Sequence, residues 1–255
     1  MENRNMMNLS ARECRAKSLE ILGNATRLWK AALDNGKGAD YGLSISLMVI
    51  SIEELVKALI LILDASGFEF RKSTSVKRFF TDHHIRHVTS FWLMVFYVFG
   101  SDANKILSGI GITPQNLMAL FNIVQSKDER MRRLTNWYLE KKIHQLLVEL
   151  EWFSQMENYR QNGFYCDYDH SPLNIQFDEF QIALEKLDKV RRVATGIIEI
   201  YQNLTPQALK EAKQLSKTLK DSHLYEALGR GIDSIKRNKN EAFDGLLKTF
   251  REYTI

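Results

Sequence analysis

The apolar positions along the first quarter of the chain follow helical spacing. From Ala11, apolar residues recur every three or four positions as far as the polar, glycine-containing stretch 34–38, which is typical of an amphipathic helix. Ser10 and Glu13 fit a capping box, in which each side chain satisfies a free backbone amide at a helix start. Residues 39–65 are apolar almost all round. A helix with this pattern is expected at the centre of a fold.

The remaining apolar pattern also predicts helices, separated by short turn-forming stretches. The further segments are 73–99, ending at Gly100; 114–161, with a break favoured near 126–128; 178–203; and short helices within 206–255. An aromatic loop, with a strand-like stretch at most, is predicted over 164–172. The pattern therefore predicts an all-α fold, with a bundle of long helices over residues 1–205 and a C-terminal helical extension over 206–255.

Composition supports this fold class and bears on the protein's partners and cellular compartment. The chain has 255 residues, of which 45% are hydrophobic, and only 3 Pro and 13 Gly, which favours long helices over a sheet with many turns. A net charge of +4 permits a polyanionic partner such as RNA without requiring one. Cys14 and Cys166 form no paired motif, which fits a reducing cytoplasm. The run 41–63 carries charges and 88–99 is too short to span a bilayer, so no membrane association is expected.

The central helix contains charged residues where the pattern predicts burial. Glu53, Glu54 and Lys57 interrupt an apolar segment, and Lys57 is correctly spaced to pair with either acid on the same helix. Because an unpaired buried charge is very costly, these groups need partners. A structural ion pair and a functional site both remain open at this point.

A basic cluster follows in the next segment. His83 and His87 are four residues apart, His84 and His87 are three apart, and Arg86 lies three after His83. Two histidines with a carboxylate from the central helix could bind a metal. Arg86 would repel a cation, however, and the segment has no Glu three residues before a His, so no metal or other cofactor is expected.

Arg78 and His83 suggest a different chemistry. A helix start at Thr81–Asp82 would bend Arg78 back toward His83. An imidazole that moves a proton and a guanidinium that stabilises charge on phosphorus are what phosphodiester cleavage without a metal requires. An isolated Arg/His pair is more often structural than catalytic, so the spacing alone does not decide between these roles.

Three motifs, in order, resemble the AbiV-type abortive infection family. They are the stretch from Glu53 to Lys57, which resembles a Glu-Glu-Leu-Gly-Lys helix; His83 followed by Arg86; and residues 162–167 with Tyr165 and Asp167 before Pro172. The resemblance covers about residues 10–175. Four positions depart from the usual residues: Val56 for Gly, Arg86 for Lys, Phe164 for Leu and Cys166 for Val. The change at Val56 raises a question about close helix packing at that point.

The resemblance implies a bacterial phage-defence protein related to HEPN domains. These are all-helical dimers, and many are metal-independent ribonucleases in which four to six residues separate an Arg from a following His. Arg78 with His83 matches that spacing, as does Arg78 with His84. The two motif copies meet at the dimer interface, which would turn the charges of the central helix toward the partner subunit.

On this reading, Arg78 and His83 cleave RNA in a homodimer, Glu53 and Lys57 orient the basic cluster, and Arg86 contacts phosphate. The supporting polar cluster comprises Glu53, Glu54, Lys57, Asp82, His84, Arg86 and His87. The alternative is a non-catalytic interaction protein that blocks phage growth by binding a phage or host protein. The aromatic run Phe91, Trp92, Phe96, Tyr97 and Phe99 is expected in the core under either reading.

Overall fold

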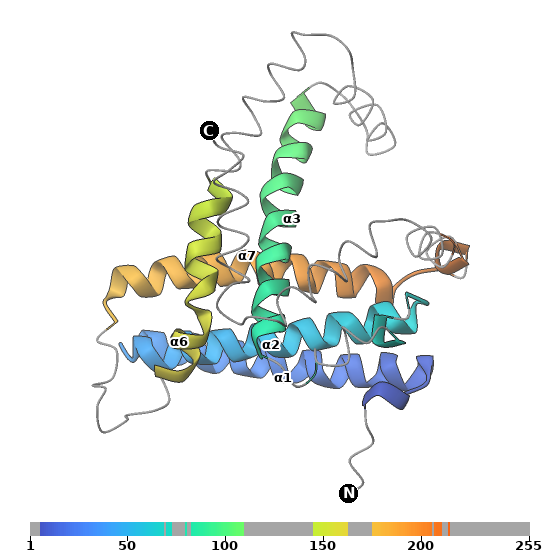
Figure 1. The fold of residues 1–255 in the computed structure, drawn as a ribbon, viewed down its shortest axis with the longest axis horizontal. Helices are drawn as coiled ribbons and strands as arrows, with labels where there is room; N and C mark the ends of the chain where they lie inside the picture. The colour runs from blue at the N-terminus through green and yellow to red at the C-terminus, as the bar shows by residue number, and fades with distance from the viewer. Residues whose placement is uncertain are drawn as a thin grey trace, which may run out of the picture.

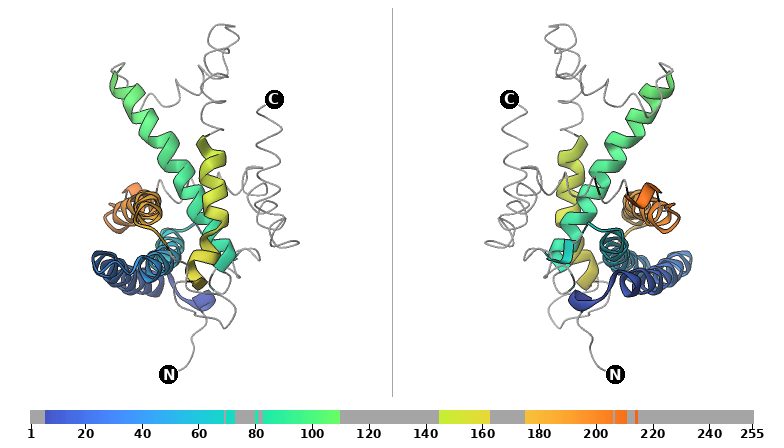
Figure 2. Two further views of the ribbon diagram at one scale, coloured as in Figure 1. Left: turned by 90° about the vertical axis from the view of Figure 1, so that its left-hand side faces the viewer. Right: turned by 90° about the vertical axis from the view of Figure 1, so that its right-hand side faces the viewer.

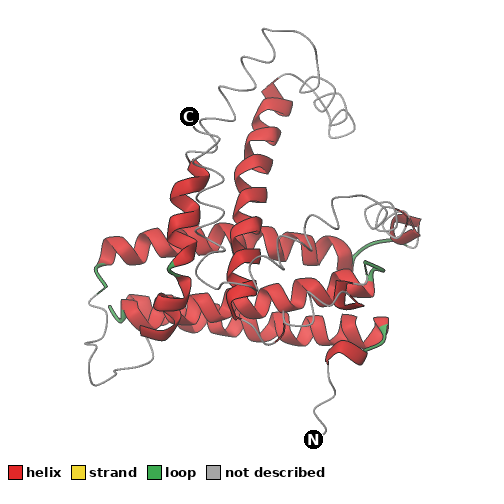
Figure 3. Ribbon diagram, viewed as in Figure 1, coloured by secondary structure: helices red, strands yellow, loops and turns green. Residues whose placement is uncertain are grey.

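A computed structural model of the protein describes residues 6–68, 70–72, 80, 83–109, 145–162, 175–205, 207–210 and 214. Within these ranges every regular element is a helix and no strand occurs (Figure 3). The predicted all-α fold class is therefore confirmed. The loop predicted over 164–172 and nearly all of the predicted extension over 206–255 lie outside the described residues.

The first two long helices begin where the sequence predicts. Helix α1 spans Ala11–Lys37, and the predicted capping box is present, with Ser10 accepting a hydrogen bond from the Glu13 amide and the Glu13 carboxylate accepting one from the Ser10 amide. Helix α2 spans Tyr41–Ala65, with Asp40 at its N-cap. The two helices run side by side (Figure 1).

Small hydroxyl side chains join α1 to α2 at close range. Ser18 Oγ donates to the Ala58 carbonyl at 2.8 Å, and Ser51 Oγ donates to the Ala25 carbonyl at 2.7 Å. Serine is small enough for two backbones to approach closely while its hydroxyl finds an acceptor. These contacts hold α2 in a fixed register against α1.

The other described helices complete the bundle. Helix α3 spans His83–Gly109, residues 145–154 form a helix, α6 spans Met156–Asn162, and α7 spans Phe177–Gln202, with the short 3-10 turns η1 (Met6–Asn8) and η2 (Phe70–Lys72) near one end. Helices α1, α2 and α7 lie along a common direction, and α3 and α6 cross them (Figures 1 and 2). Helix α2 contacts α1, α3, α6 and α7. Its predicted central position is confirmed.

Two predicted boundaries are wrong. Helix α3 continues through Gly100 to Gly109, because one glycine inside a helix costs only about 1 kcal/mol and does not end it. The helix predicted over 114–161 is interrupted at Gln155, where no break was predicted and whose amide donates to the Trp152 carbonyl three residues back. This tighter turn separates residues 145–154 from α6. The break favoured near 126–128 lies outside the described residues.

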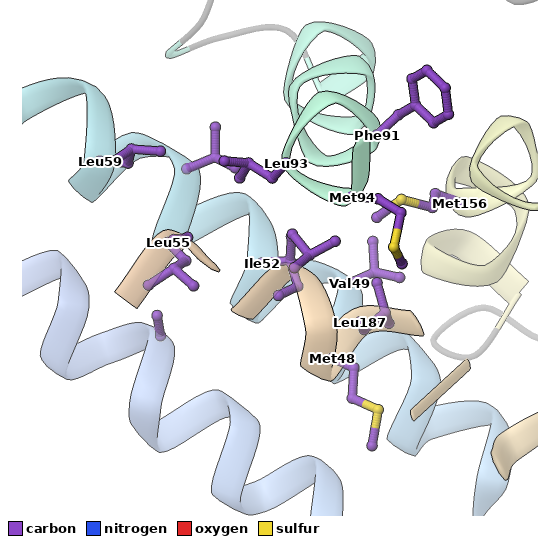
Figure 4. Close-up of a cluster of buried hydrophobic side chains, with 14 of the residues drawn as sticks. Met48, Val49, Ile52, Leu55, Leu59, Phe91, Leu93, Met94, Met156 and Leu187 are labelled. Carbon is purple, nitrogen blue, oxygen red and sulfur yellow. The ribbon is translucent and has the colours of Figure 1, made fainter. Parts of the chain in front are cut away.

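The core lies between α2 and the helices around it. Figure 4 shows side chains from α2, α3, α6 and α7 converging on one cluster, including Ile52, Met94, Met156 and Leu187. Val56 is fully buried in the same core, so valine is accommodated where the family usually has glycine. No helix among the described residues is long and apolar enough to cross a membrane.

The aromatic run on α3 is only partly core. Phe91 is buried as predicted, but Trp92 and Phe96 are exposed, which contradicts the expectation for these two residues. They lie four residues apart and share a face of α3, whereas Phe91 and Met94 contribute to the core. Tyr97 is half-buried, and the Phe99 side chain lies outside the described residues.

Two glycines of α1, Gly36 and Gly23, differ in how closely other side chains pack against them. A Cβ added at Gly36 would lie 2.5 Å from Phe180 Cζ and 3.2 Å from Ser44 Oγ, whereas one added at the exposed Gly23 would meet nothing within 4 Å. We expect Gly36→Ala to destabilise the fold by about 1–3 kcal/mol through overpacking. Gly23→Ala should stabilise it by up to about 1 kcal/mol through helix propensity. Urea unfolding of both variants checks this, and a stabilised Gly36→Ala would contradict it.

Candidate functional site

Glu53 of α2 is the centre of a buried polar cluster. Its residue exposure is only 2%, although it carries a carboxylate. Because α2 is surrounded by other helices, the hydrogen-bonding partners of the Glu53 carboxylate must come from neighbouring helices rather than from water. Those partners are provided by α3 and α6.

The two carboxylate oxygens of Glu53 have different partners. Oε2 lies 2.6 Å from His83 Nδ1 and accepts hydrogen bonds from Arg86 Nη2 at 3.0 Å and Nε at 3.2 Å. Oε1 lies 2.9 Å from His87 Nε2 and 3.8 Å from Arg160 Nε. His83, Arg86 and His87 share one face of α3, because residues three and four apart are neighbours on a helix. The predicted meeting of the basic cluster with the central helix is thus observed for these residues.

These contacts keep Glu53 ionised despite its burial. Burial acts to raise the pKa of the carboxyl, but the hydrogen bond from His87 and the charges of His87, Arg86 and His83 outweigh it and lower the pKa from 4.5 to about 2. The site therefore holds a permanent negative charge at neutral pH, surrounded by basic groups.

The ionised carboxylate also selects the tautomer of His83. Arg86 Nη2 lies 2.7 Å from His83 Nδ1, and a guanidinium can only donate. Nδ1 cannot both accept from Arg86 and donate to Glu53, and the 2.6 Å contact with a carboxylate oxygen requires a proton. We therefore assign the proton to Nδ1. In the neutral ring, Nε2 then carries the lone pair.

Accessibility separates His83 from its neighbours. Its side chain is 44% exposed, whereas Arg86 is 3% exposed and His87 is fully buried. His83 is therefore the member of the α3 trio that an external molecule can reach. The other two are internal partners of Glu53.

Helix α6 adds two residues that the sequence interpretation missed. Arg160 donates to Glu157 from Nε at 3.0 Å and from Nη2 at 2.5 Å, and Glu157 Oε2 lies 4.0 Å from His87 Nδ1. Burial acts to raise the pKa of Glu157, but Arg160 and, more weakly, His87 lower it below its usual value. Helix α6 contacts both α2 and α3, and Figure 4 shows Met156 of α6 beside Met94 of α3.

One signal could have identified this pair. Glu157 and Arg160 are three residues apart and immediately precede the motif that begins at Asn162. A Glu/Arg pair at this spacing also fits the solvated face of an amphipathic helix, so the spacing alone does not assign the pair to a site.

A metal would have to compete with these guanidinium groups. Glu53, His87 and Glu157 each offer a ligand atom, and these atoms lie within 4.8 Å of one another. However, both carboxylates already accept hydrogen bonds from arginine. A cation would have to displace Arg86 and Arg160 or be repelled by them. The donor set therefore fits an ion-pair network better than a metal centre.

The other predicted site residues divide into two groups. Lys57 pairs with Glu54 on α2 rather than with Glu53, so these two form a separate intrahelical pair. Arg78, Asp82, Tyr165 and Asp167, and the His84 side chain, lie outside the described residues, although α3 does begin at His83, directly after the predicted helix start.

Two expectations about the cluster need revision. Arg86, which we expected to contact phosphate, is buried and donates twice to Glu53. Glu53 was also expected to face a partner subunit, but its carboxylate is satisfied by α3 and α6 of its own chain.

Comparison with known proteins identifies the family. Searches of curated proteins and of solved structures returned no significant match. The family model HEPN_AbiV, described as AbiV, matches residues 13–192. That range covers more than half of the 255 residues and contains α1 from residue 13 onward, all of α2, α3 and α6, and the Glu53 cluster. The chain therefore belongs to the AbiV family of HEPN-like proteins, which act in abortive infection, a form of bacterial defence against phage.

Proposed function

We propose that this abortive infection protein is a metal-independent endoribonuclease in which His83 transfers the proton. One observation carries the proposal: a half-exposed imidazole is held through Nδ1, at 2.6 Å, by a buried and ionised carboxylate. This arrangement presents the other ring nitrogen as a base and is the one used by histidines oriented by an acid in hydrolytic sites.

The reaction that fits this histidine is transesterification within RNA. His83 Nε2 would take the proton of a 2′-hydroxyl as its oxygen forms a bond to phosphorus, and the bond from phosphorus to the 5′-oxygen would break. The leaving oxygen takes a proton from solvent or from a second acid. The products are a 2′,3′-cyclic phosphate and a 5′-hydroxyl. Arg78 is the residue proposed to stabilise the charge that develops on the phosphorane.

Glu53 would act as a positioning residue in this reaction. It fixes the His83 ring and tautomer, and its negative charge favours the imidazolium that forms when the proton is taken. Because the pKa of Glu53 is about 2, the carboxylate keeps this role across the neutral range. Glu54 and Lys57 would contribute only to the structure of α2.

Incubation of the purified protein with labelled cellular and transfer RNA in excess chelator tests the proposal. We expect cleavage to continue in chelator, because the reaction needs only side chains and the RNA 2′-hydroxyl. Mapping of fragment ends should find cyclic phosphates. Cleavage that stops with chelator, or leaves 3′-hydroxyl ends, would refute the mechanism.

The second candidate function is binding without catalysis. It is favoured by the burial of Glu53, Arg86 and His87, which suits a network that stabilises the fold, and by the exposed Trp92 and Phe96 on α3. In this case the wild type yields no RNA fragments, and a pull-down during infection recovers a phage or host protein. Trp92→Ala and Phe96→Ala together should abolish that recovery without unfolding the chain.

The proposal includes a cytoplasmic homodimer, with residues 1–205 as its helical bundle and 206–255 as an extension. Light scattering on the purified protein measures the oligomeric state. A monomer at micromolar concentration would remove the dimer from the proposal while leaving the His83 chemistry to be tested separately.

A further inference from the structure

The two arginines of the cluster are in different environments. Arg86 is 3% exposed and donates to Glu53 from two nitrogens, so its charge is committed inside the protein. Arg160 is 20% exposed and lies 3.8 Å from the opposite oxygen of the same carboxylate. Only Arg160, of these two, is accessible to an external anion.

The partner of Arg160 is also accessible. Glu157 is 32% exposed and holds the guanidinium through two hydrogen bonds. A partly exposed ion pair of this kind contributes little to stability and can exchange partners. A guanidinium that fits a carboxylate through two donors also fits a phosphate through two donors.

Exchange would leave Glu157 with an alternative partner. Its Oε2 lies 4.0 Å from His87 Nδ1, and His87 Nε2 already faces Glu53. If Arg160 turned to a phosphate while the His87 ring carried a proton on both nitrogens, a modest movement of Glu157 would bring its carboxylate within hydrogen-bonding distance of Nδ1. The charge of Glu157 would then stay compensated within the cluster.

We propose that Arg160 binds a phosphate of the RNA and that Glu157 holds this guanidinium in place until RNA arrives. His83 and Arg160 lie on opposite oxygens of the Glu53 carboxylate, so a base and a phosphate ligand would be positioned by one buried charge. The inference rests on the proposed function for its substrate class, single-stranded RNA. It assigns the phosphate contact to Arg160, where the sequence interpretation had expected Arg86.

Binding of a labelled single-stranded 2′-O-methyl RNA oligonucleotide, followed by fluorescence anisotropy over a range of salt concentrations, tests this directly. The oligonucleotide lacks a free 2′-hydroxyl, so it is bound without being cleaved. We expect Arg160→Ala to weaken binding roughly 10- to 100-fold, as for loss of a charge-assisted contact. The slope of log affinity against log salt should fall by roughly 0.7, as for one lost phosphate contact.

Three further variants separate phosphate binding from a structural role. Arg160→Lys keeps the charge but not the two-donor fork, and should bind with intermediate affinity. Glu157→Gln should bind RNA more tightly, by up to about fivefold, because the competing carboxylate is gone. Arg192→Ala, which removes an exposed arginine paired with Asp188 on α7, is the matched control and should change little. Thermal unfolding shows whether each variant is folded.

The outcomes are distinguishable from those of the proposed function. If Arg160→Ala and Arg192→Ala bind with the same affinity and salt slope, the phosphate role is overturned, whether or not the wild type cleaves RNA. If Glu157→Gln weakens binding as much as Arg160→Ala does, the pair is structural and the proposal also fails. If Arg160→Ala behaves as expected but the wild type makes no RNA fragments, the phosphate contact stands and the ribonuclease proposal falls.

Discussion

Replacing Glu53 with alanine is expected to destabilise the protein by about 3–5 kcal/mol, the cost typical of breaking a buried ion pair by removing one partner. Arg86 and His87 are both buried and donate to this carboxylate, and neither can turn to solvent without disturbing α3. Urea unfolding followed by circular dichroism measures the effect. This substitution should have the largest effect on stability of any in the cluster.

Glu54 offers a matched control on the same helix. Its carboxylate pairs with Lys57 within α2, and both side chains are partly exposed. We expect Glu54→Ala to cost less than about 1 kcal/mol, as for other pairs in contact with solvent. Equal losses for the two variants would mean that the cluster is hydrated and that its burial does not govern its energetics.

The same carboxylate gives stability a defined pH dependence. Its pKa is lowered from 4.5 to about 2 in the folded protein, so the unfolded chain binds a proton first as the pH falls. The lowered pKa of Glu53 therefore contributes about 3 kcal/mol to the free energy of unfolding. This contribution is fully present above pH 4.5 and is lost as the pH falls toward 2. Glu53→Gln should remove this part of the acid dependence. An unchanged acid profile in Glu53→Gln would contradict the assigned pKa.

The sequence predicts a helix boundary well where a capping motif or a turn marks it. The capping box at Ser10 and the turn after Ala65 both lie where the sequence places them, because capping depends on residues within one turn. The helix end predicted at Gly100 was wrong because a glycine alone does not determine where a helix ends. Whether a glycine ends a helix depends on the residues and contacts around it, which allow α3 to continue to Gly109.

The candidate site was partly predictable for a similar reason. His83, Arg86 and His87 share a face by spacing alone, and the apolar flanks of Glu53 indicate that it needs partners. Which carboxylate they meet depends on how α3 crosses α2. Spacing alone does not decide between Glu53 and Glu54, although we expected Glu53 to orient the basic cluster. Arg160 reaches the cluster from α6, which begins after the interruption at Gln155, and no local motif predicts that interruption.

Removing the imidazole of His83 is expected to abolish RNA cleavage and toxicity while the fold is retained. Proton transfer by a positioned side chain contributes about 10²- to 10⁴-fold to rate, so His83→Ala should lose at least that much activity. Stability should change little, because the side chain is half-exposed and Glu53 keeps Arg86 and His87 as partners. Single-turnover cleavage and bacterial growth after induction measure the two effects.

His83→Asn separates the two roles of the ring. An asparagine amide can donate to Glu53 as Nδ1–H does, but it cannot accept and release a proton at neutral pH. If His83 is the base, the asparagine variant should be as inactive as the alanine variant and as stable as the wild type. If asparagine instead restores toxicity, the ring serves only to satisfy Glu53, and the cluster is a structural network in a protein that acts by binding. A single pair of substitutions at the exposed edge of the cluster thus decides between the two functions proposed for this protein.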